Sequence, residues 1–137
     1  MVKLITGGKG TGKTKIMIEM ANQCVSSGKG NVVFLDDDNR HMYDLNHHVR
    51  FISLHEYPVN DEKSFRGFLC GIIAADHDIE VIFIDGLLKI ADLSMDKAYG
   101  IIADIETLSL NHRIDFILSI HCETDNLPQE LQKYRVV

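Results

Sequence analysis

A glycine-rich stretch near the start of the chain constrains the fold more than any other feature of the sequence. It reads Gly7-Gly8-Lys9-Gly10-Thr11-Gly12-Lys13-Thr14 and satisfies the pattern G-x-x-x-x-G-K-[ST] in full. The apolar run 2–5 precedes this stretch, and apolar residues at helical spacing follow it from Lys13 to Val25. Strand, glycine-rich loop and helix in this order predict a loop whose backbone N–H groups surround an anion at the start of a helix.

Each part of this stretch has an expected role toward a bound triphosphate. Glycine lets the backbone turn closely around phosphate oxygens, because it carries no Cβ atom. Lys13 is expected to act in catalysis by bringing a mobile positive charge to the β- and γ-phosphates, and Thr14 to ligate Mg²⁺ through its hydroxyl. We interpret Lys9 as a solvent-exposed loop residue. The expected ATP-binding residues are Gly7, Gly8, Lys9, Gly10, Thr11, Gly12, Lys13 and Thr14.

The rest of the chain alternates apolar strands with amphipathic helices. Strands are expected at residues 31–36, 50–54, 81–84 and 114–120, helices at 61–73 and 94–108, and a short helix at 128–133 before a final edge strand at 134–137. Continuously apolar strands are typical of parallel strands that are buried on both faces of a sheet. The alternation therefore predicts a doubly wound, mostly parallel α/β sheet. Because the 137 residues show no linker or repeat, a single nucleotide-binding domain over residues 1–137 is expected.

Acidic residues stand at the ends of two predicted strands, where ligands bind in open α/β sheets. Asp85 closes the apolar run 81–84 and matches a Walker B aspartate, which binds Mg²⁺ through the water shell of the ion. Gly86 follows, so the glutamate that many ATPases carry after this aspartate is missing. Asp36, Asp37 and Asp38 close the second predicted strand, and we interpret the first two as acids of a solvent-exposed loop.

The chain resembles the RecA-like branch of P-loop ATPases over about residues 1–120, through the glycine-rich stretch and the order of its strands. This resemblance implies that strand 114–120 lies between the P-loop strand and the Walker B strand, with Ser119 and His121 facing the γ-phosphate. In that branch the second strand ends in Asp-x-Glu, and the glutamate activates the attacking water. Asp36-Asp37-Asp38 is one methylene shorter, which implies Asp38 as the catalytic acid and slow hydrolysis.

Other families share parts of the pattern. The whole chain is similar to small firmicute ATP-binding proteins that carry a "twitching motility" label, but it lacks the extra N-terminal domain and the His and Asp boxes of pilus-retraction ATPases. Thymidine kinases share the P-loop and an Asp-Asn-Arg run, here 38–40, but this chain lacks their zinc-binding cysteine cluster and their carboxylate next to the Walker B aspartate. The Asn-Lys-x-Asp run of GTPases is absent, which disfavours GTP.

Composition limits the remaining functions. The net charge of −6 shows no basic face for nucleic acid, and no apolar run approaches the roughly 20 residues that span a bilayer. The start of the chain lacks a basic-then-apolar leader, so we expect a cytoplasmic protein without membrane contact. The cysteines are expected to be buried reduced thiols: Cys24, Cys70 and Cys122. Four histidines match no zinc spacing and are interpreted as surface residues: His41, His47, His48 and His55.

The sequence leaves three functions open. The first is a Mg²⁺-dependent ATP-binding protein whose slow ATP hydrolysis, as a weak P-loop ATPase, drives a conformational or partner-binding change. The second is a nucleotide-binding switch without significant turnover. The third is a small-molecule kinase of the nucleoside type. A protein partner or a homo-oligomer is compatible with each, and the sequence names neither.

Overall fold

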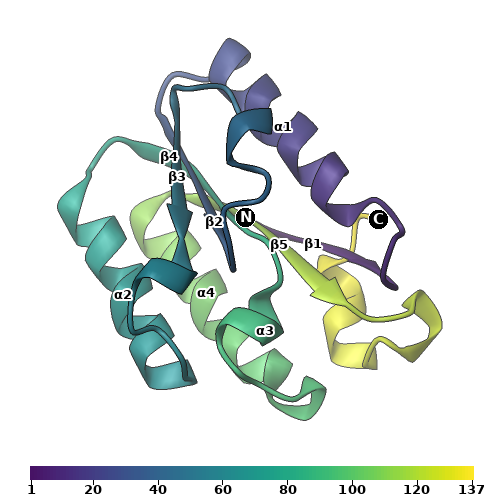
Figure 1. The fold of residues 1–137 in the computed structure, drawn as a ribbon. Helices are drawn as coiled ribbons and strands as arrows, with labels where there is room; N and C mark the ends of the chain where they lie inside the picture. The colour runs from purple at the N-terminus through teal and green to yellow at the C-terminus, as the bar shows by residue number, and fades with distance from the viewer.

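The chain forms one five-stranded sheet with helices on both of its faces (Figure 1). The structure is a computed structural model and describes residues 1–137. The strands and α-helices are β1 (Val2–Gly7), α1 (Lys13–Ser27), β2 (Asn31–Asp36), β3 (Val49–Ser53), α2 (Glu62–Ala75), β4 (Ile79–Ile84), α3 (Leu87–Ile90), α4 (Ala98–His112) and β5 (Asp115–His121). The 3₁₀ helices are η1 (Met42–Asp44), η2 (Leu54–Glu56), η3 (Met95–Lys97), η4 (Thr124–Asn126) and η5 (Gln129–Tyr134).

The strand order is β1-β5-β4-β2-β3, and every neighbouring pair runs parallel. The predicted α/β fold with a parallel sheet is therefore confirmed. β5 lies between β1 and β4, although it is the last of the five strands along the chain. Since all strands point the same way, their carboxyl ends meet at one edge of the sheet, which we call the carboxyl edge.

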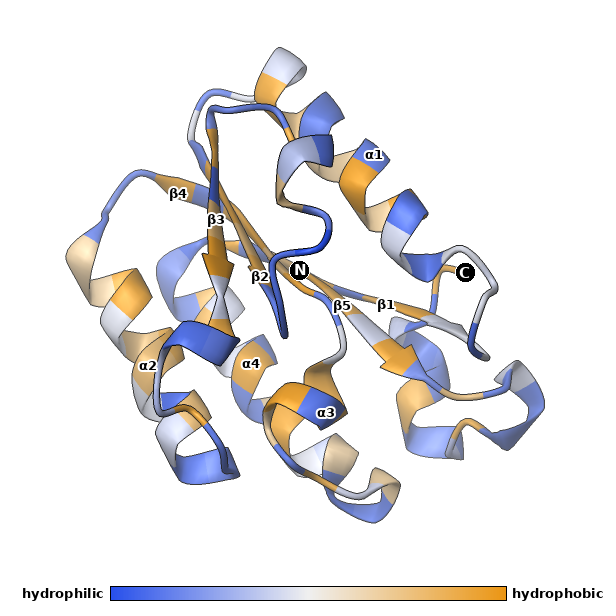
Figure 2. Ribbon diagram, in the orientation of Figure 1, coloured by the Kyte–Doolittle hydropathy of each residue, from blue (hydrophilic) through white to orange (hydrophobic).

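Each strand contributes apolar side chains to both faces of the sheet. In β4, Val81 and Phe83 pack in the cluster that includes α1, whereas Ile82 and Ile84 pack in the cluster that includes α2 and α4. Figure 2 shows the strands as almost continuously apolar, while the helices alternate between apolar and polar residues. This pattern is what two covering layers of helices require. None of the helices combines the length and the apolar character that crossing a bilayer requires.

Two sequence-based expectations need correction. The short helix α3 begins two residues after Asp85, where no helix was predicted, because four residues cannot display helical periodicity. The cysteines are not all buried: Cys70 is exposed, and the other two are half-buried. Cys70 is exposed because Phe65, Leu69 and Ile73 occupy the side of α2 that packs on the sheet.

The two edge strands differ in how far the chain covers them. At β1, the Val136 N–H donates to the Leu4 carbonyl at 2.9 Å, and the Thr6 N–H donates to the Val137 carbonyl at 3.0 Å. The predicted final edge strand at 134–137 is not formed: Arg135 makes only an isolated parallel bridge with Leu4, and Tyr134 belongs to the 3₁₀ helix η5, which takes the place of the helix predicted at 128–133. β3 pairs with β2 alone.

Candidate functional site

The glycine-rich loop (residues 7–14) connects β1 to α1. Gly10 and Gly12 have positive φ angles of 79° and 86°, a backbone conformation that residues with a side chain rarely adopt. Gly12 is the N-cap of α1, and it provides no side-chain hydrogen bond to the first turn of that helix. The amide N–H groups at the start of α1 are therefore free to bind an anion.

Lys13 folds back over the loop that precedes it. Its Nζ atom donates hydrogen bonds of 2.9 Å to the carbonyl oxygens of Gly7 and Gly8. Within the loop, the Thr11 hydroxyl donates a hydrogen bond of 2.7 Å to the Gly8 carbonyl oxygen. The positive charge of Lys13 thus lies at the loop among neutral carbonyl groups, where an anionic ligand can replace them as its partner.

Asp85 joins three elements at the carboxyl edge. It follows β4 directly and is 8% exposed. Its Oδ2 atom accepts a hydrogen bond of 2.8 Å from the Thr14 hydroxyl at the start of α1, across 71 positions of sequence. Its Oδ1 atom accepts one of 2.7 Å from the Ser119 hydroxyl of β5. The two residues predicted to bind Mg²⁺, Thr14 and Asp85, therefore lie in direct contact.

Asp36 is a second buried acid, and its interpretation as an exposed loop residue was wrong. It is the last residue of β2, is paired in register with Ser53 of β3, and is 8% exposed. Its carboxylate accepts a hydrogen bond of 2.7 Å from the Asp37 N–H. Burial, followed by the like charge of Asp85, raises the pKa of Asp36 to about 7. The feature of the sequence that could have predicted the burial of Asp36 is its position at the end of an apolar strand.

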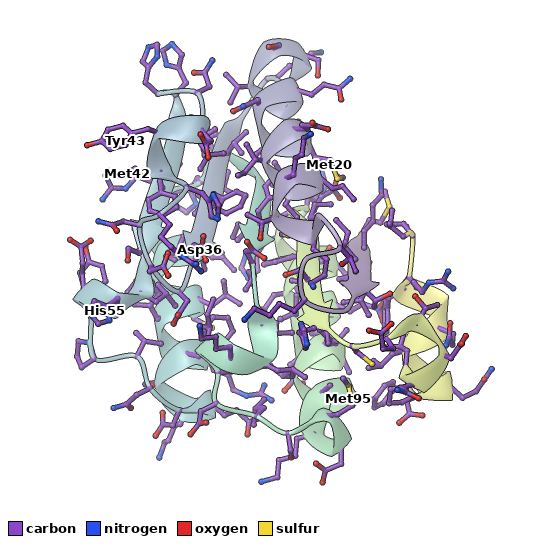
Figure 3. The ribbon with its side chains drawn as sticks, turned by 45° about the vertical axis from the view of Figure 1, so that its right-hand side comes forward. Met20, Asp36, Met42, Tyr43, His55 and Met95 are labelled. Atoms are coloured by element: carbon purple, nitrogen blue, oxygen red, sulfur yellow. The ribbon has the colours of Figure 1, made fainter.

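The next two acids point to other partners. Asp37 forms an ion pair of 2.9 Å with Lys89 of α3. Asp38 accepts hydrogen bonds from its neighbour Arg40, at 3.0 Å from the backbone N–H and 2.9 Å from Nε, and these bonds lower the pKa of Asp38. Asp36 lies inside the molecule in Figure 3, whereas His55 points outward at its rim. Three consecutive acids thus occupy three environments.

The remaining predicted residues are spread over the surface and the strand ends. Lys9 is exposed at the tip of the glycine-rich loop, and His121 is exposed at the end of β5. Ser119, which the resemblance places at the γ-phosphate, is buried and bonded to Asp85. The histidines do not gather at one point: the His47 and His48 rings contact each other with centroids 4.1 Å apart, while His41 lies 3.4 Å from Asp44.

The donor set at Thr14 and Asp85 suits Mg²⁺. Hydroxyl and carboxylate oxygens are ligands that this ion prefers, and sites that bind it with phosphates take few ligands from the protein. The two buried acids Asp36 and Asp85 form no ion pair with a cationic side chain, so a bound cation would supply the missing positive charge. No group of three or more His, Cys, Asp and Glu side chains converges on one point of the chain.

A polar cleft of about 320 Å³ opens beside this site. Asp37, His55 and Asn60 line it from the loops that follow β2 and β3, and Lys89 and Asp92 line it from α3 and the residues after it. Asp37 follows Asp36 directly, and α3 begins shortly after Asp85, so the cleft borders the two buried acids. It offers room for a second small polar molecule at the carboxyl edge.

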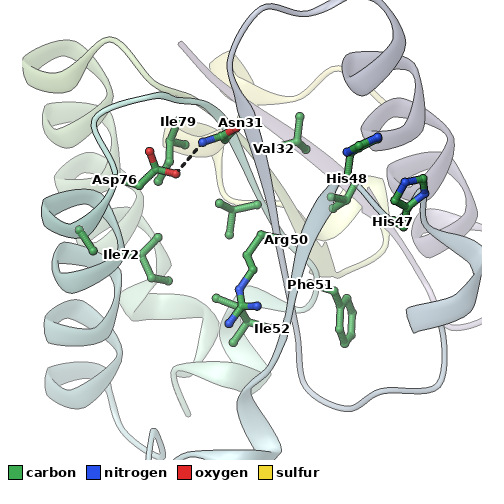
Figure 4. Close-up of a pocket in the computed structure, with 13 residues that line it drawn as sticks. Asn31, Val32, His47, His48, Arg50, Phe51, Ile52, Ile72, Asp76 and Ile79 are labelled. Carbon is green, nitrogen blue, oxygen red and sulfur yellow. Dashed lines mark hydrogen bonds between the residues drawn. The ribbon is translucent and has the colours of Figure 1, made fainter.

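The largest cavity, of about 550 Å³, lies elsewhere, along β3 and the last turns of α2 (Figure 4). Its lining includes Asn31 and Ile79, the first residues of β2 and β4, and therefore belongs to the opposite ends of these strands. Arg50 points into it, and the Asn31 side chain donates to Asp76 at 2.9 Å. None of the residues of the glycine-rich loop lines this cavity, so size alone does not identify the functional site.

No model of a known protein family matches the chain, and a search of curated proteins finds no match either. The function must therefore be argued from the chemistry of the site itself. That chemistry consists of a glycine-rich loop at a helix start, a lysine bonded only to neutral carbonyl groups, and two buried carboxylates.

Proposed function

We propose that this protein is a P-loop protein of RecA-like strand order that binds ATP with Mg²⁺ and hydrolyses it slowly. The observation that carries the proposal is the hydrogen bond of 2.8 Å between the Thr14 hydroxyl and the Asp85 carboxylate. It joins the end of the glycine-rich loop to a buried acid at the end of β4, across the intervening strand β5. The two hydroxyl groups that bond Asp85 are neutral, so its buried negative charge lacks a cationic partner, which a bound Mg²⁺ would supply.

Each group has a role in nucleotide binding. The free N–H groups at the start of α1 and in the glycine-rich loop bind phosphate oxygens, and Lys13 exchanges the Gly7 and Gly8 carbonyls for the terminal phosphates. The Thr14 hydroxyl, with Asp85 behind it, would bind Mg²⁺. When bound, this ion neutralises the phosphate charge that develops in the reaction.

Slow turnover follows from how the acids are placed. Gly86 stands where many ATPases have a glutamate, and Asp38, the acid that the family resemblance assigns to the attacking water, is bonded to Arg40. A misplacement of about 1 Å in a catalytic group can cost on the order of 100-fold in rate. We therefore propose that ATP binding and slow hydrolysis serve a conformational or partner-binding change.

A thermal unfolding experiment tests ATP binding. Mg-ATP should raise the melting temperature of the wild type, because a ligand that binds only the folded state stabilises it. Lys13→Ala should abolish most of this rise and leave the melting temperature without ligand nearly unchanged. Lys9→Ala is the matched control, since it also removes a lysine from the loop but should keep the rise. An equal rise in Lys13→Ala would contradict the assignment of the loop.

The polar cleft of about 320 Å³ favours a second candidate, a small-molecule kinase. In that case the cleft bordered by Asp37 and Lys89 would bind the phosphoryl acceptor next to the terminal phosphate. ATP consumption should then be negligible alone and rise on adding a nucleoside acceptor. Consumption at the same rate without any acceptor supports the ATPase, and tight ATP binding without consumption in either case supports a nucleotide-binding switch.

A further inference from the structure

One carboxylate at the glycine-rich loop has no part in the site described so far. Glu123 follows the end of β5 by two residues and is exposed, whereas Gly8 beneath it is buried. A Cβ atom added to Gly8 would collide with the Glu123 Oε1 atom. The Glu123 carboxylate therefore packs directly on the loop at Gly8, and a larger residue there would displace it.

The backbone holds Glu123 at this place. Gly7 and Cys122 exchange two hydrogen bonds: the Gly7 N–H donates to the Cys122 carbonyl at 2.9 Å, and the Cys122 N–H donates to the Gly7 carbonyl at 3.1 Å. Glu123 is the next residue, and its own carbonyl accepts from the Asn126 N–H at 2.9 Å. These bonds hold the backbone of Glu123 beside the glycine-rich loop.

Lys13 indicates which phosphate would face Glu123. The Lys13 Nζ atom lies 2.9 Å from the Gly8 carbonyl oxygen, and the lysine of such a loop reaches the β- and γ-phosphates. Gly8 thus marks the end of the loop that faces the terminal phosphates, and the Glu123 carboxylate lies at the same end. An acid at that position repels a bound triphosphate, and a role toward another molecule there, such as water, would account for this cost.

The strand order separates Glu123 from the acids that follow β2. β5 is the immediate neighbour of β1, whereas β2 is the third strand from β1. Neighbouring strands lie about 4.8 Å apart, so β2 ends roughly 14 Å from the strand that carries the glycine-rich loop. Asp37 and Asp38 are also bonded to Lys89 and Arg40, while the Glu123 carboxylate forms neither an ion pair nor a hydrogen bond within the chain.

We propose, resting on the ATP-binding function above, that Glu123 is the catalytic carboxylate for hydrolysis. Its carboxylate accepts a hydrogen bond from a water molecule and orients it toward the γ-phosphorus. The water oxygen bonds to this phosphorus, the bond from phosphorus to the bridging oxygen breaks, and ADP leaves with that electron pair. The water proton passes to Glu123 and then to solvent, and inorganic phosphate is the second product.

Steady-state ATP hydrolysis and equilibrium ATP binding, measured on the same variants, test this role. Glu123→Gln should lower kcat by about 100-fold or more, while KM and the affinity for Mg-ATP stay the same or improve, because a negative charge near the phosphates is removed. Glu123→Asp should retain part of the activity, since it keeps a carboxylate with a shorter reach. Glu130→Gln, the same change at another exposed residue, should behave as wild type.

The possible results separate this proposal from the function on which it rests. Turnover by Glu123→Gln within threefold of the wild-type rate would overturn the catalytic role. So would joint loss of ATP binding and turnover, because Glu123 would then only support the shape of the loop. A wild type that binds Mg-ATP without measurable turnover would overturn the catalytic role and leave nucleotide binding intact. A wild type that does not bind ATP would instead refute the proposed function.

Discussion

Two pairs of acids at the carboxyl edge show how differently one sheet can place the same chemical group. Asp36 ends β2 and Asp85 follows β4, and each is 8% exposed. Asp38 and Glu123 lie in the loops that follow β2 and β5, and both reach solvent. The strand-end acids take their positions from the pairing of the sheet, whereas Asp38 is held by its bonds to Arg40, and Glu123 by the hydrogen bonds between Gly7 and Cys122.

This difference separates two tasks. A buried carboxylate must be compensated, as Asp85 is by two hydroxyl groups, and it therefore suits a fixed role such as binding a cation. An exposed carboxylate needs no such compensation and remains available to water and to a ligand. We thus expect changes at the buried pair to affect metal binding and stability, and a change at Glu123, whose carboxylate has no partner within the chain, to affect turnover alone.

Among the changes in this comparison, the largest effect on ATP affinity is expected for Asp85→Asn. The change removes the charge next to the Thr14 hydroxyl, so affinity for ATP in the presence of Mg²⁺ should fall on the order of 10- to 100-fold. Binding in EDTA should stay nearly unchanged. Ser119→Ala removes a hydrogen bond to Asp85 but no charge, and it should weaken Mg²⁺-dependent binding less. ATP titrations with and without EDTA measure these affinities. A wild type that binds ATP equally well in EDTA would contradict the proposed role of Asp85 in binding Mg²⁺.

Asp36→Asn should have an intermediate effect, and the quantity that it changes is the free energy of unfolding. The pKa of Asp36 is raised from 3.8 to about 7, so the folded state binds its proton more tightly than the unfolded state does. The free energy of unfolding should therefore fall as pH rises from about 4 to about 7. In metal-free buffer, Asp36→Asn should be more stable than the wild type by about 1–3 kcal/mol at pH 8, and this gain should shrink at pH 5. Urea unfolding at both pH values measures it; a gain of equal size at both would refute the assignment.

Asp38→Asn should have the smallest effect, because Asp38 is exposed and bonded to Arg40 rather than to the buried acids. We expect ATP turnover within about threefold of wild type, as for most surface substitutions away from a site. A loss of 100-fold or more, with ATP binding intact, would instead restore Asp38 to the role that the family resemblance implies.

Much of the fold could be predicted because its determinants are local. Apolar runs bounded by glycine or polar residues located all five strands within a few residues, and helical periodicity located α1, α2 and α4. Helix α3 escaped prediction because its four residues carry no periodicity. The exposure of Cys70 was not predicted for another reason: residue type alone does not show which side of α2 packs on the sheet.

At the site, the sequence by itself identified the glycine-rich loop and singled out Thr14 and Asp85, because motif and strand end are both local patterns, whereas their hydrogen bond across 71 positions came from the tertiary structure. Only the tertiary structure decided which of three consecutive aspartates is buried, and it placed Glu123 against Gly8. These two results depend on β5 lying between β1 and β4 and on β2 lying beside β4. The order of strands across a sheet is set by long-range packing, which brings together side chains that no spacing along the chain connects.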